Sequence, residues 1–133
     1  MSARERGTLR TEVLKVANAG WEAFAATDTD AMREYFSPEM VDEYVERYAD
    51  YAEQGRERHR DYDVTFFDVT SMSSDGGEVG ILIELADNSY FVEPDGSKTD
   101  PSGMPRTVTL DLARAEDGTY RITKIVAPQE FLE

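Results

Sequence analysis

A carboxylate together with a phenol is the combination in this chain that could move protons, and Asp68 with Tyr44 or Tyr48 could form it. An aspartate acts as a general base when its surroundings match its pKa to the reaction, and a phenol can donate a hydrogen bond to a developing oxyanion. Asp68 can take this role only if its side chain points into the protein. The apolar alternation around it changes phase at Phe66 and Phe67, which favours an outward Asp68.

Aromatic side chains at helical and strand positions are a second candidate, because ligand pockets are mostly apolar and aromatic with a few polar groups. The candidate ligand-binding residues are Trp21, Tyr35, Tyr44, Tyr48, Phe66 and Tyr120. Such a set is also typical of a packed core whose tyrosine hydroxyls reach the rim, and we favour this interpretation.

The segment Arg56–Arg60 is the one basic stretch of an acidic chain, and it contains the only histidine, His59. Such a group could bind a carboxylate or a phosphate, or act as a pH-sensitive contact. We favour a solvated connection between a helix and a strand, with its cations near the helix C-terminus. A single histidine without acidic helpers beside it does not make a metal site, so we expect no metal and no cofactor. The sequence also lacks nucleophile-elbow and phosphate-loop motifs.

The amino-acid composition limits the classes of partner that the chain could bind. The chain has 133 residues, a formal net charge of −14 and no cysteine, which fits one domain over residues 1–133 with an acidic surface. This charge disfavours nucleic acids and anionic membranes, and no apolar stretch is long enough to insert into a bilayer. The charged start lacks the apolar segment of a signal peptide, so we expect a cytoplasmic protein. The alternative is an extracytoplasmic soluble domain of a membrane-tethered protein.

Helical periodicity covers residues from about 8 to 54. The first predicted helix spans about residues 8–26 and has one apolar face, which includes Trp21 and Phe24. A short second helix follows the capping residues around Asp28. The third begins at Pro38, after Ser37 at the N-cap position, and ends before Gly55.

Strand-like alternation covers residues from about 61 to 126. We predict a first strand with a bulge at the Phe66–Phe67 step, a second strand that continues bent through Tyr90–Val92, a loop over 93–105 and a closing hairpin over 107–126. In this hairpin Val126 is predicted to face inward. The order predicts an α+β fold with three N-terminal helices packed on a curved four-stranded antiparallel sheet. No carboxylate falls on the inward strand positions considered, and Lys124, which shares the phase of Tyr120 and Ile122, is expected to reach water from a strand end. The space under the sheet is therefore predicted to be apolar and uncharged.

The layout resembles the nuclear transport factor 2-like superfamily, a cystatin-like α+β cone, over nearly the whole chain. The stretches that carry the resemblance are "YDV" from Tyr62, "GGEVGILIEL" from Gly76 and "TVTLDLARAEDGTYRITKIV" from Thr107. It is nearest to the domain of chloroplast-division proteins and their bacterial relatives, although Tyr120 stands where such families commonly have Trp. The superfamily includes proton-transfer isomerases, dehydratases and polyketide cyclases as well as non-catalytic binding modules, so fold alone does not imply function.

The uncharged inward positions and this resemblance favour a non-enzymatic interaction domain. The expected partner is another protein or a second copy of the chain, bound through the cone mouth or the outer sheet face around Leu82 and Thr109. One alternative is an isomerase- or cyclase-type enzyme that uses Asp68 as its base, with Tyr44 or Tyr48 as the oxyanion donor. Another is a carrier that shelters a small apolar ligand in the cone.

Overall fold

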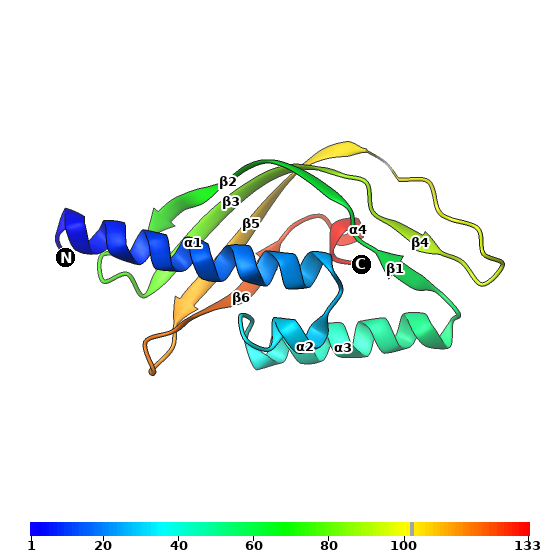
Figure 1. The fold of residues 1–133 in the computed structure, drawn as a ribbon, viewed down its shortest axis with the longest axis horizontal. Helices are drawn as coiled ribbons and strands as arrows, with labels where there is room; N and C mark the ends of the chain where they lie inside the picture. The colour runs from blue at the N-terminus through cyan, green and yellow to red at the C-terminus, as the bar shows by residue number, and fades with distance from the viewer. Residues whose placement is uncertain (102) are drawn as a thin grey trace.

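A long first helix, α1 (Ala3–Ala25), lies across one side of an antiparallel sheet in the computed structural model, which describes residues 1–101 and 103–133 (Figure 1). The helix begins about five residues earlier than predicted because Ser2 and Glu5 form a capping box at its N-terminus. Its buried face includes Val13, Ala17, Trp21 and Phe24. None of the helices in the described residues is long and apolar enough to cross a membrane.

The two other N-terminal helices confirm the predicted helical layer. Helix α2 (Thr29–Met32) is capped by the side chain of Asp28, and α3 (Pro38–Glu53) has a proline in its first turn. The chain leaves α3 through Gly55, whose positive φ of 71° suits a glycine. These two helices and the segment between them deliver Met32, Phe36, Val41 and Tyr44 to the core.

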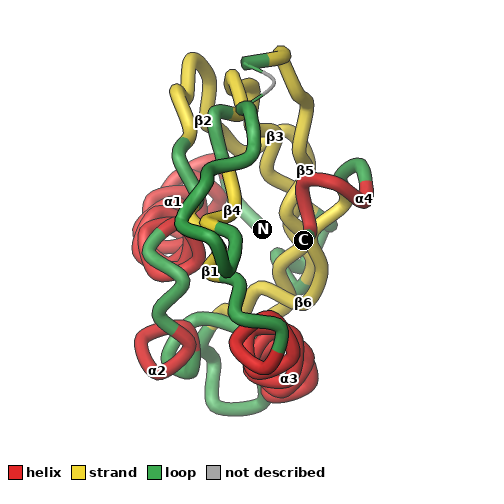
Figure 2. Tube along the Cα trace, turned by 90° about the vertical axis from the view of Figure 1, so that its right-hand side faces the viewer, coloured by secondary structure: helices red, strands yellow, loops and turns green. Residues whose placement is uncertain are grey.

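The predicted four-stranded antiparallel sheet is confirmed, with strands in the order β2 (Tyr62–Met72), β3 (Glu78–Asp87), β5 (Met104–Arg114) and β6 (Tyr120–Val126). The fold is therefore α+β. Helices α1 and α3 lie on the same side of the curved sheet (Figures 1 and 2). The loop predicted over 93–105 gives way to β5 at Met104, and Ser102 within it lies outside the described residues.

The two strands of a small ribbon and a final helix were not predicted as separate elements. The segment Tyr90–Val92 forms a separate strand, β4, which pairs with β1 (Glu57–His59) in a two-stranded ribbon rather than extending β3. A short final helix, α4 (Gln129–Leu132), follows β6 and lies toward the same end of the molecule as the ribbon (Figure 1). This end, away from the start of α1, is called the wide end of the cone below, and the opposite end the narrow end.

The predicted bulge in β2 is confirmed, one step earlier than expected. The register shifts between Val64 and Phe66, so Phe67 pairs with Ile83 of the buried face and Phe66 with Glu84 of the outer face. A second shift, between Asp111 and Leu112, changes the phase of the closing hairpin. The prediction that Val126 faces inward is wrong for this reason: Ile125 is buried in its place.

Candidate functional site

Arg60, in the connection between β1 and β2, is a buried cation at the wide end of the cone. Only 9% of its surface is exposed. Its guanidinium lies over the ring of Phe24, with the central carbon 4.1 Å from the ring centroid. Nε donates to the hydroxyl of Tyr48 and Nη1 to that of Tyr62, each at 3.1 Å. An aromatic face and two phenols therefore replace much of the water that this charge loses.

Two predictions are wrong at this point. The segment Arg56–Arg60 is not a solvated connection throughout, and the space under the sheet is not free of charge. Arg60 shares the inward strand phase of Tyr62, so extending the alternation back by one step would have found it. Asp87 extends the inward phase of β3 in the same way and is also 9% exposed.

Asp87 brings a carboxylate to the same end of the cone. Its Cα is paired with that of Tyr62 across β2 and β3, and its Oδ1 accepts a hydrogen bond of 3.0 Å from the backbone N–H of Ser89. Burial raises the pKa of Tyr62, and the charge of Asp87 acts in the same direction against the opposing effect of Arg60. Burial also raises the pKa of Tyr44 to about 12. Both phenols therefore keep their protons at neutral pH and remain hydrogen-bond donors.

Four aromatic rings form a cluster beside Arg60, and its guanidinium lies over one of them, Phe24. The cluster consists of Trp21, Phe24, Tyr62 and Phe131. The Phe131 ring is fully buried, 4.9 Å from Tyr62 and 6.0 Å from both Trp21 and Phe24 between centroids. Three of the rings belong to the cone itself. Phe131 comes from α4, so the last described segment of the chain fills the centre of the cluster.

The polar side of Arg60 faces the same segment. Nη1 donates to the main-chain oxygen of Phe131 at 2.9 Å, and Nη2 donates to those of Leu132 and Glu133 at 3.4 and 3.2 Å. We use the name mouth site for Arg60 with the groups that surround it, namely Tyr48, Tyr62, Trp21 and Phe24. The mouth site thus combines an apolar ring slot with an oxygen-binding cation, and residues 131–133 occupy both.

Some of the predicted ligand-binding residues lie at this end and others do not. Trp21 and Tyr48 belong to the mouth site, and the Tyr44 ring packs against Phe24 at 5.4 Å. Three lie elsewhere. Tyr120 is buried at the narrow end, where its hydroxyl donates to the Gly76 carbonyl. Phe66 is 41% exposed on the outer sheet face, and Tyr35 adjoins β6 through its backbone.

Asp68 is not brought together with the tyrosines that were expected to accompany it. Its carboxylate lies 2.5 Å from the guanidinium of Arg10 on α1 and also accepts from the backbone N–H of Val69. It pairs across the sheet with Leu82, on the opposite phase to the buried residues. Tyr48 instead binds Arg60 at the mouth site. The structure thus separates the predicted base from its predicted oxyanion donors.

The rest of the basic segment follows the β1–β4 ribbon. The His59 ring stacks on Tyr90 at 5.1 Å, and its Nε2 lies 3.3 Å from the Glu57 carboxylate. Arg58 lies over Phe91, with 4.6 Å between its central carbon and the ring centroid. Burial lowers the pKa of Arg58, and its Nε is buried without a hydrogen-bond partner among the described residues.

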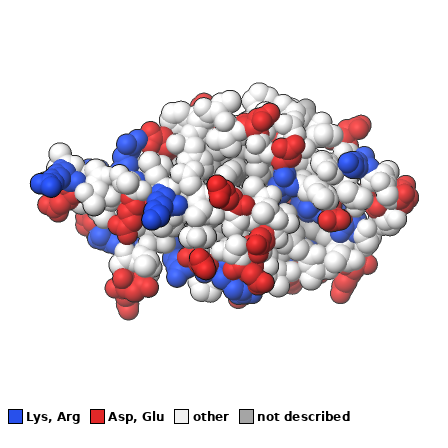
Figure 3. All heavy atoms as spheres, viewed as in Figure 1, with Lys and Arg blue, Asp and Glu red and all other residues white. Residues whose placement is uncertain are grey.

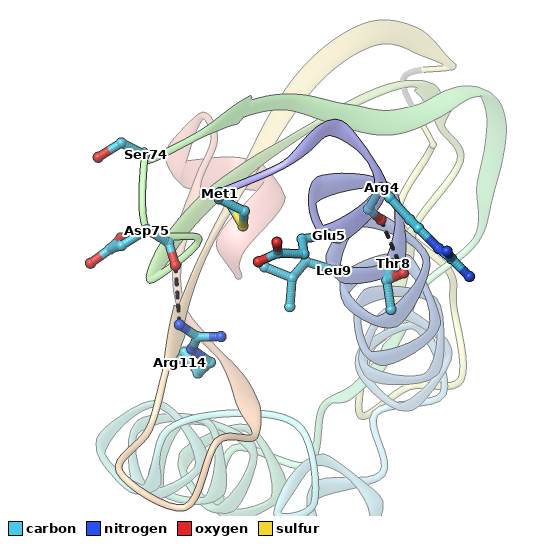
Figure 4. Close-up of a pocket in the computed structure, with 8 residues that line it drawn as sticks. All are labelled: Met1, Arg4, Glu5, Thr8, Leu9, Ser74, Asp75 and Arg114. Carbon is cyan, nitrogen blue, oxygen red and sulfur yellow. Dashed lines mark hydrogen bonds between the residues drawn. The ribbon is translucent and has the colours of Figure 1, made fainter.

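A large hollow lies at the other, narrow end of the molecule, beside the start of α1. It has a volume of about 790 Å³, and Leu9, Asp75 and Arg114 are among its lining residues (Figure 4). Its polar groups are satisfied locally: Asp75 accepts from Ser73 and Gly77, which lowers its pKa, and Arg114 donates to the Asp75 carbonyl. The hollow has no buried charge, so the mouth site is the stronger candidate.

No family model and no curated protein sequence matches the chain, but solved structures do. One is the intermembrane space region of the chloroplast protein ARC6, with 19% identity, 96% of each chain covered and a TM-score of 0.55. A ketosteroid isomerase-like protein from Erwinia carotovora atroseptica SCRI1043 has 14% identity, 87% of this chain and 92% of its own covered, and a TM-score of 0.56.

A third similar structure is a protein from Catenulispora acidiphila in complex with S-DNPA, with 14% identity, 95% of this chain and 98% of its own covered, and a TM-score of 0.54. The chain therefore shares its α+β fold with these solved structures. At such identities the likenesses concern the fold alone. The chemistry of the chain therefore has to be argued from its own residues.

Proposed function

We propose that this protein binds a small organic molecule at the mouth site, with an apolar ring in the aromatic cluster and an oxygen atom on Arg60. The observation that carries the proposal is the buried guanidinium, whose acceptors are two phenols and three main-chain oxygens of residues 131–133. A charge kept in an apolar interior is costly, and such groups gather where ligands or substrates bind. This interpretation replaces the interaction domain that the sequence favoured.

The donors at the mouth site define what it would recognise. A guanidinium and protonated phenols offer hydrogen bonds to a carbonyl, a carboxylate or an enolate oxygen. The rings of Trp21, Phe24 and Tyr62 offer flat apolar faces. Turnover would require a base, and Asp87 rather than Asp68 lies next to Tyr62. We propose binding as the function because no substrate carbon is defined against which a base could be placed.

Fluorescence of Trp21, the only tryptophan, provides the test because its ring is part of the cluster. Titration of the full chain with 2-naphthoate is expected to change this fluorescence saturably. Arg60→Met should weaken the binding at least about tenfold, since a charge-assisted contact is lost. The control is Arg33→Met, because Arg33 is exposed and its ion pair with Asp30 is long, at 3.9 Å. Absence of saturation in every variant would refute the proposed function.

A second candidate function, self-association through the outer sheet face, is supported by exposed apolar side chains there. Phe66 and Val126 are 41% and 47% exposed, and the register places Leu82 in the same row as Val126 through Thr109. Sedimentation equilibrium should then detect a dimer that Phe66→Ser weakens. A monomer at all concentrations up to the millimolar range would argue against this candidate.

A further inference from the structure

The segment of residues 128–133, here called the plug segment, is held in the mouth site by other parts of the chain. Its helix α4 has four residues, which is far too short to be stable without tertiary contacts. Those contacts come mainly from cations and a phenol: Arg47 donates to the main-chain oxygen of Leu132, Arg58 to that of Glu130 and Tyr51 to that of Glu133. The conformation of the plug segment is therefore set by the cone.

The plug segment presents two chemical groups to the site. The first is the ring of Phe131, stacked against Trp21 and Tyr62 with interplanar angles of 17° and 25°. The second is a set of main-chain oxygens, received by the Nη atoms of Arg60. A flat ring with oxygen acceptors a short distance from it is also what an aromatic carboxylate presents. The plug segment therefore indicates the shape of ligand that the mouth site can hold, because it already fills the site with a ring and oxygen acceptors.

A carboxylate would use the cations better than the main-chain carbonyls of Phe131 and Leu132 do. Hydrogen bonds with both partners ionised are shorter and stronger than those to a neutral carbonyl, and a guanidinium can bind a carboxylate through two parallel bonds. The buried Nε of Arg58, unpartnered among the described residues, adds a donor at the same end of the cone. The bonds of Tyr51 and Arg58 to the plug segment are exposed to solvent, so water can compete for them.

We infer that the plug segment is a built-in competitor for the mouth site, and that the ligand which displaces it is a flat aromatic carboxylate. The inference rests on the proposed function, since it names the ligand class and the regulation of the same site. The apparent dissociation constant then equals the intrinsic one divided by the fraction of molecules with the plug segment displaced. Weakening the plug segment should therefore strengthen ligand binding without adding any contact to the ligand.

The experiment compares 2-naphthoate binding by the native chain and by Phe131→Ala, followed through Trp21 fluorescence. Phe131→Ala is expected to bind at least about tenfold more tightly, because it empties the ring slot. Equal affinity in the two chains would overturn the inference and leave the proposed function standing. Absence of binding in both would refute the proposed function and the inference with it.

Two further variants keep the test decisive if Phe131→Ala does not fold. Phe131→Leu retains most of the buried apolar volume and should give an intermediate gain in affinity. Arg47→Gln removes a bond to the plug segment from the α3 side, so its gain should be smaller but in the same direction. Circular dichroism and thermal melting establish that each variant is folded. Unchanged affinity in the folded variants would contradict the inference.

A separate experiment tests the class of ligand by comparing a carboxylate with a neutral alcohol. In the Phe131→Ala chain, 2-naphthoate should bind more tightly than the neutral 2-naphthalenemethanol, and this preference should vanish when Arg60→Met is added. The synthetic peptide PQEFLE, the sequence of residues 128–133, should displace 2-naphthoate from the Phe131→Ala chain. Equal binding of the carboxylate and the alcohol, or no competition by the peptide, would overturn the corresponding half of the inference.

Discussion

The guanidinium of Arg60 is kept in the protein interior by an aromatic face on one side and oxygen acceptors on the other. Phe24 supplies the face, and Tyr48 and Tyr62 supply two of the acceptors. Each phenol that accepts from Arg60 keeps its own hydrogen for another partner. The same residue can therefore stabilise the fold when the plug segment is in place and recognise an oxygen atom when it is not.

Arg60→Met is expected to lower the free energy of unfolding by about 3 kcal/mol, because it leaves two phenols and several main-chain oxygens without their donor. Urea denaturation followed by circular dichroism measures the change. Arg33→Met, at an exposed position, should change it by less than about 0.5 kcal/mol. Equal losses in the two variants would mean that Arg60 has no special structural role.

Tyr44 gives the fold a dependence on alkaline pH. Burial raises its pKa to about 12, from the 10.0 that is usual for an exposed tyrosine. The native state then holds this proton more tightly than the unfolded state, so the associated stability is complete below pH 10 and is lost as the pH rises toward 12. Urea denaturation at pH 9 and pH 11, about one unit either side of pH 10, measures the free energy of unfolding. Between these two pH values it should fall less for Tyr44→Phe than for the native chain. Identical falls would contradict this assignment.

Residue-level prediction from the sequence succeeded where the alternation is unbroken, failed at the register shift that misplaced Val126, and failed where the alternation was stopped too soon. The buried positions Ile81, Ile83, Val108 and Leu110 were identified correctly. Arg60 and Asp87 were missed because they are charged and lie one step beyond the apolar runs that they continue. Strand phase depends on backbone geometry rather than on hydrophobicity, so it extends through polar residues as well.

At the scale of elements, the packing of α1 against β6 depends on a glycine. A Cβ at Gly20 would lie 2.6 Å from Ile122 Cδ1 and 3.1 Å from Tyr35 Cβ. Gly7 lies on the same helix, and a Cβ there would meet nothing within 4 Å. Alanine substitutions at the two glycines therefore distinguish the effect of helix propensity from the effect of packing against β6.

Gly20→Ala should destabilise the protein by about 1–3 kcal/mol, because overpacking outweighs the gain in helix propensity. Gly7→Ala should stabilise it by up to about 1 kcal/mol, since only propensity changes. Thermal melting of the two variants should move in opposite directions. A stabilised Gly20→Ala would mean that α1 and β6 are less tightly packed than described.

Elements with long, regular patterns were predicted well, and short elements were not. The helices and the four-stranded sheet follow from hydrophobic periodicity and from local caps such as Pro38 and Gly55. The β1–β4 ribbon and α4 have three or four residues each, too few to establish a period. Their positions depend on tertiary contacts, among them the hydrogen bonds that Arg58 and Arg60 donate to residues 130–133.

At the scale of the whole molecule, the surface is strongly acidic. The formal net charge is −14, and acidic side chains are spread over the face in Figure 3, with basic ones between them. Like charges repel one another more in the compact state than in the unfolded chain, and salt screens this repulsion. An anionic ligand would therefore approach against a negative field and bind through the cations at the mouth.

Added salt should raise the melting temperature at pH 7, because screening reduces the repulsion among the excess carboxylates. Calorimetry in sodium chloride at about 0.02 M and 0.5 M, on either side of strong screening, measures the shift. A lower melting temperature at high salt would mean that attractive ion pairs, such as those of Arg56 with Glu93 and Arg10 with Asp68, outweigh the net repulsion.

The location of the bound ligand tests the central claim most directly. Nuclear magnetic resonance of the Phe131→Ala chain, titrated with 2-naphthoate, would follow the side-chain Nε–Hε signal of Arg60 and the indole signal of Trp21. The account predicts that both signals shift saturably with one dissociation constant. Shifts confined to the outer sheet face, around Phe66, Leu82 and Val126, with the Arg60 and Trp21 signals unchanged, would contradict it.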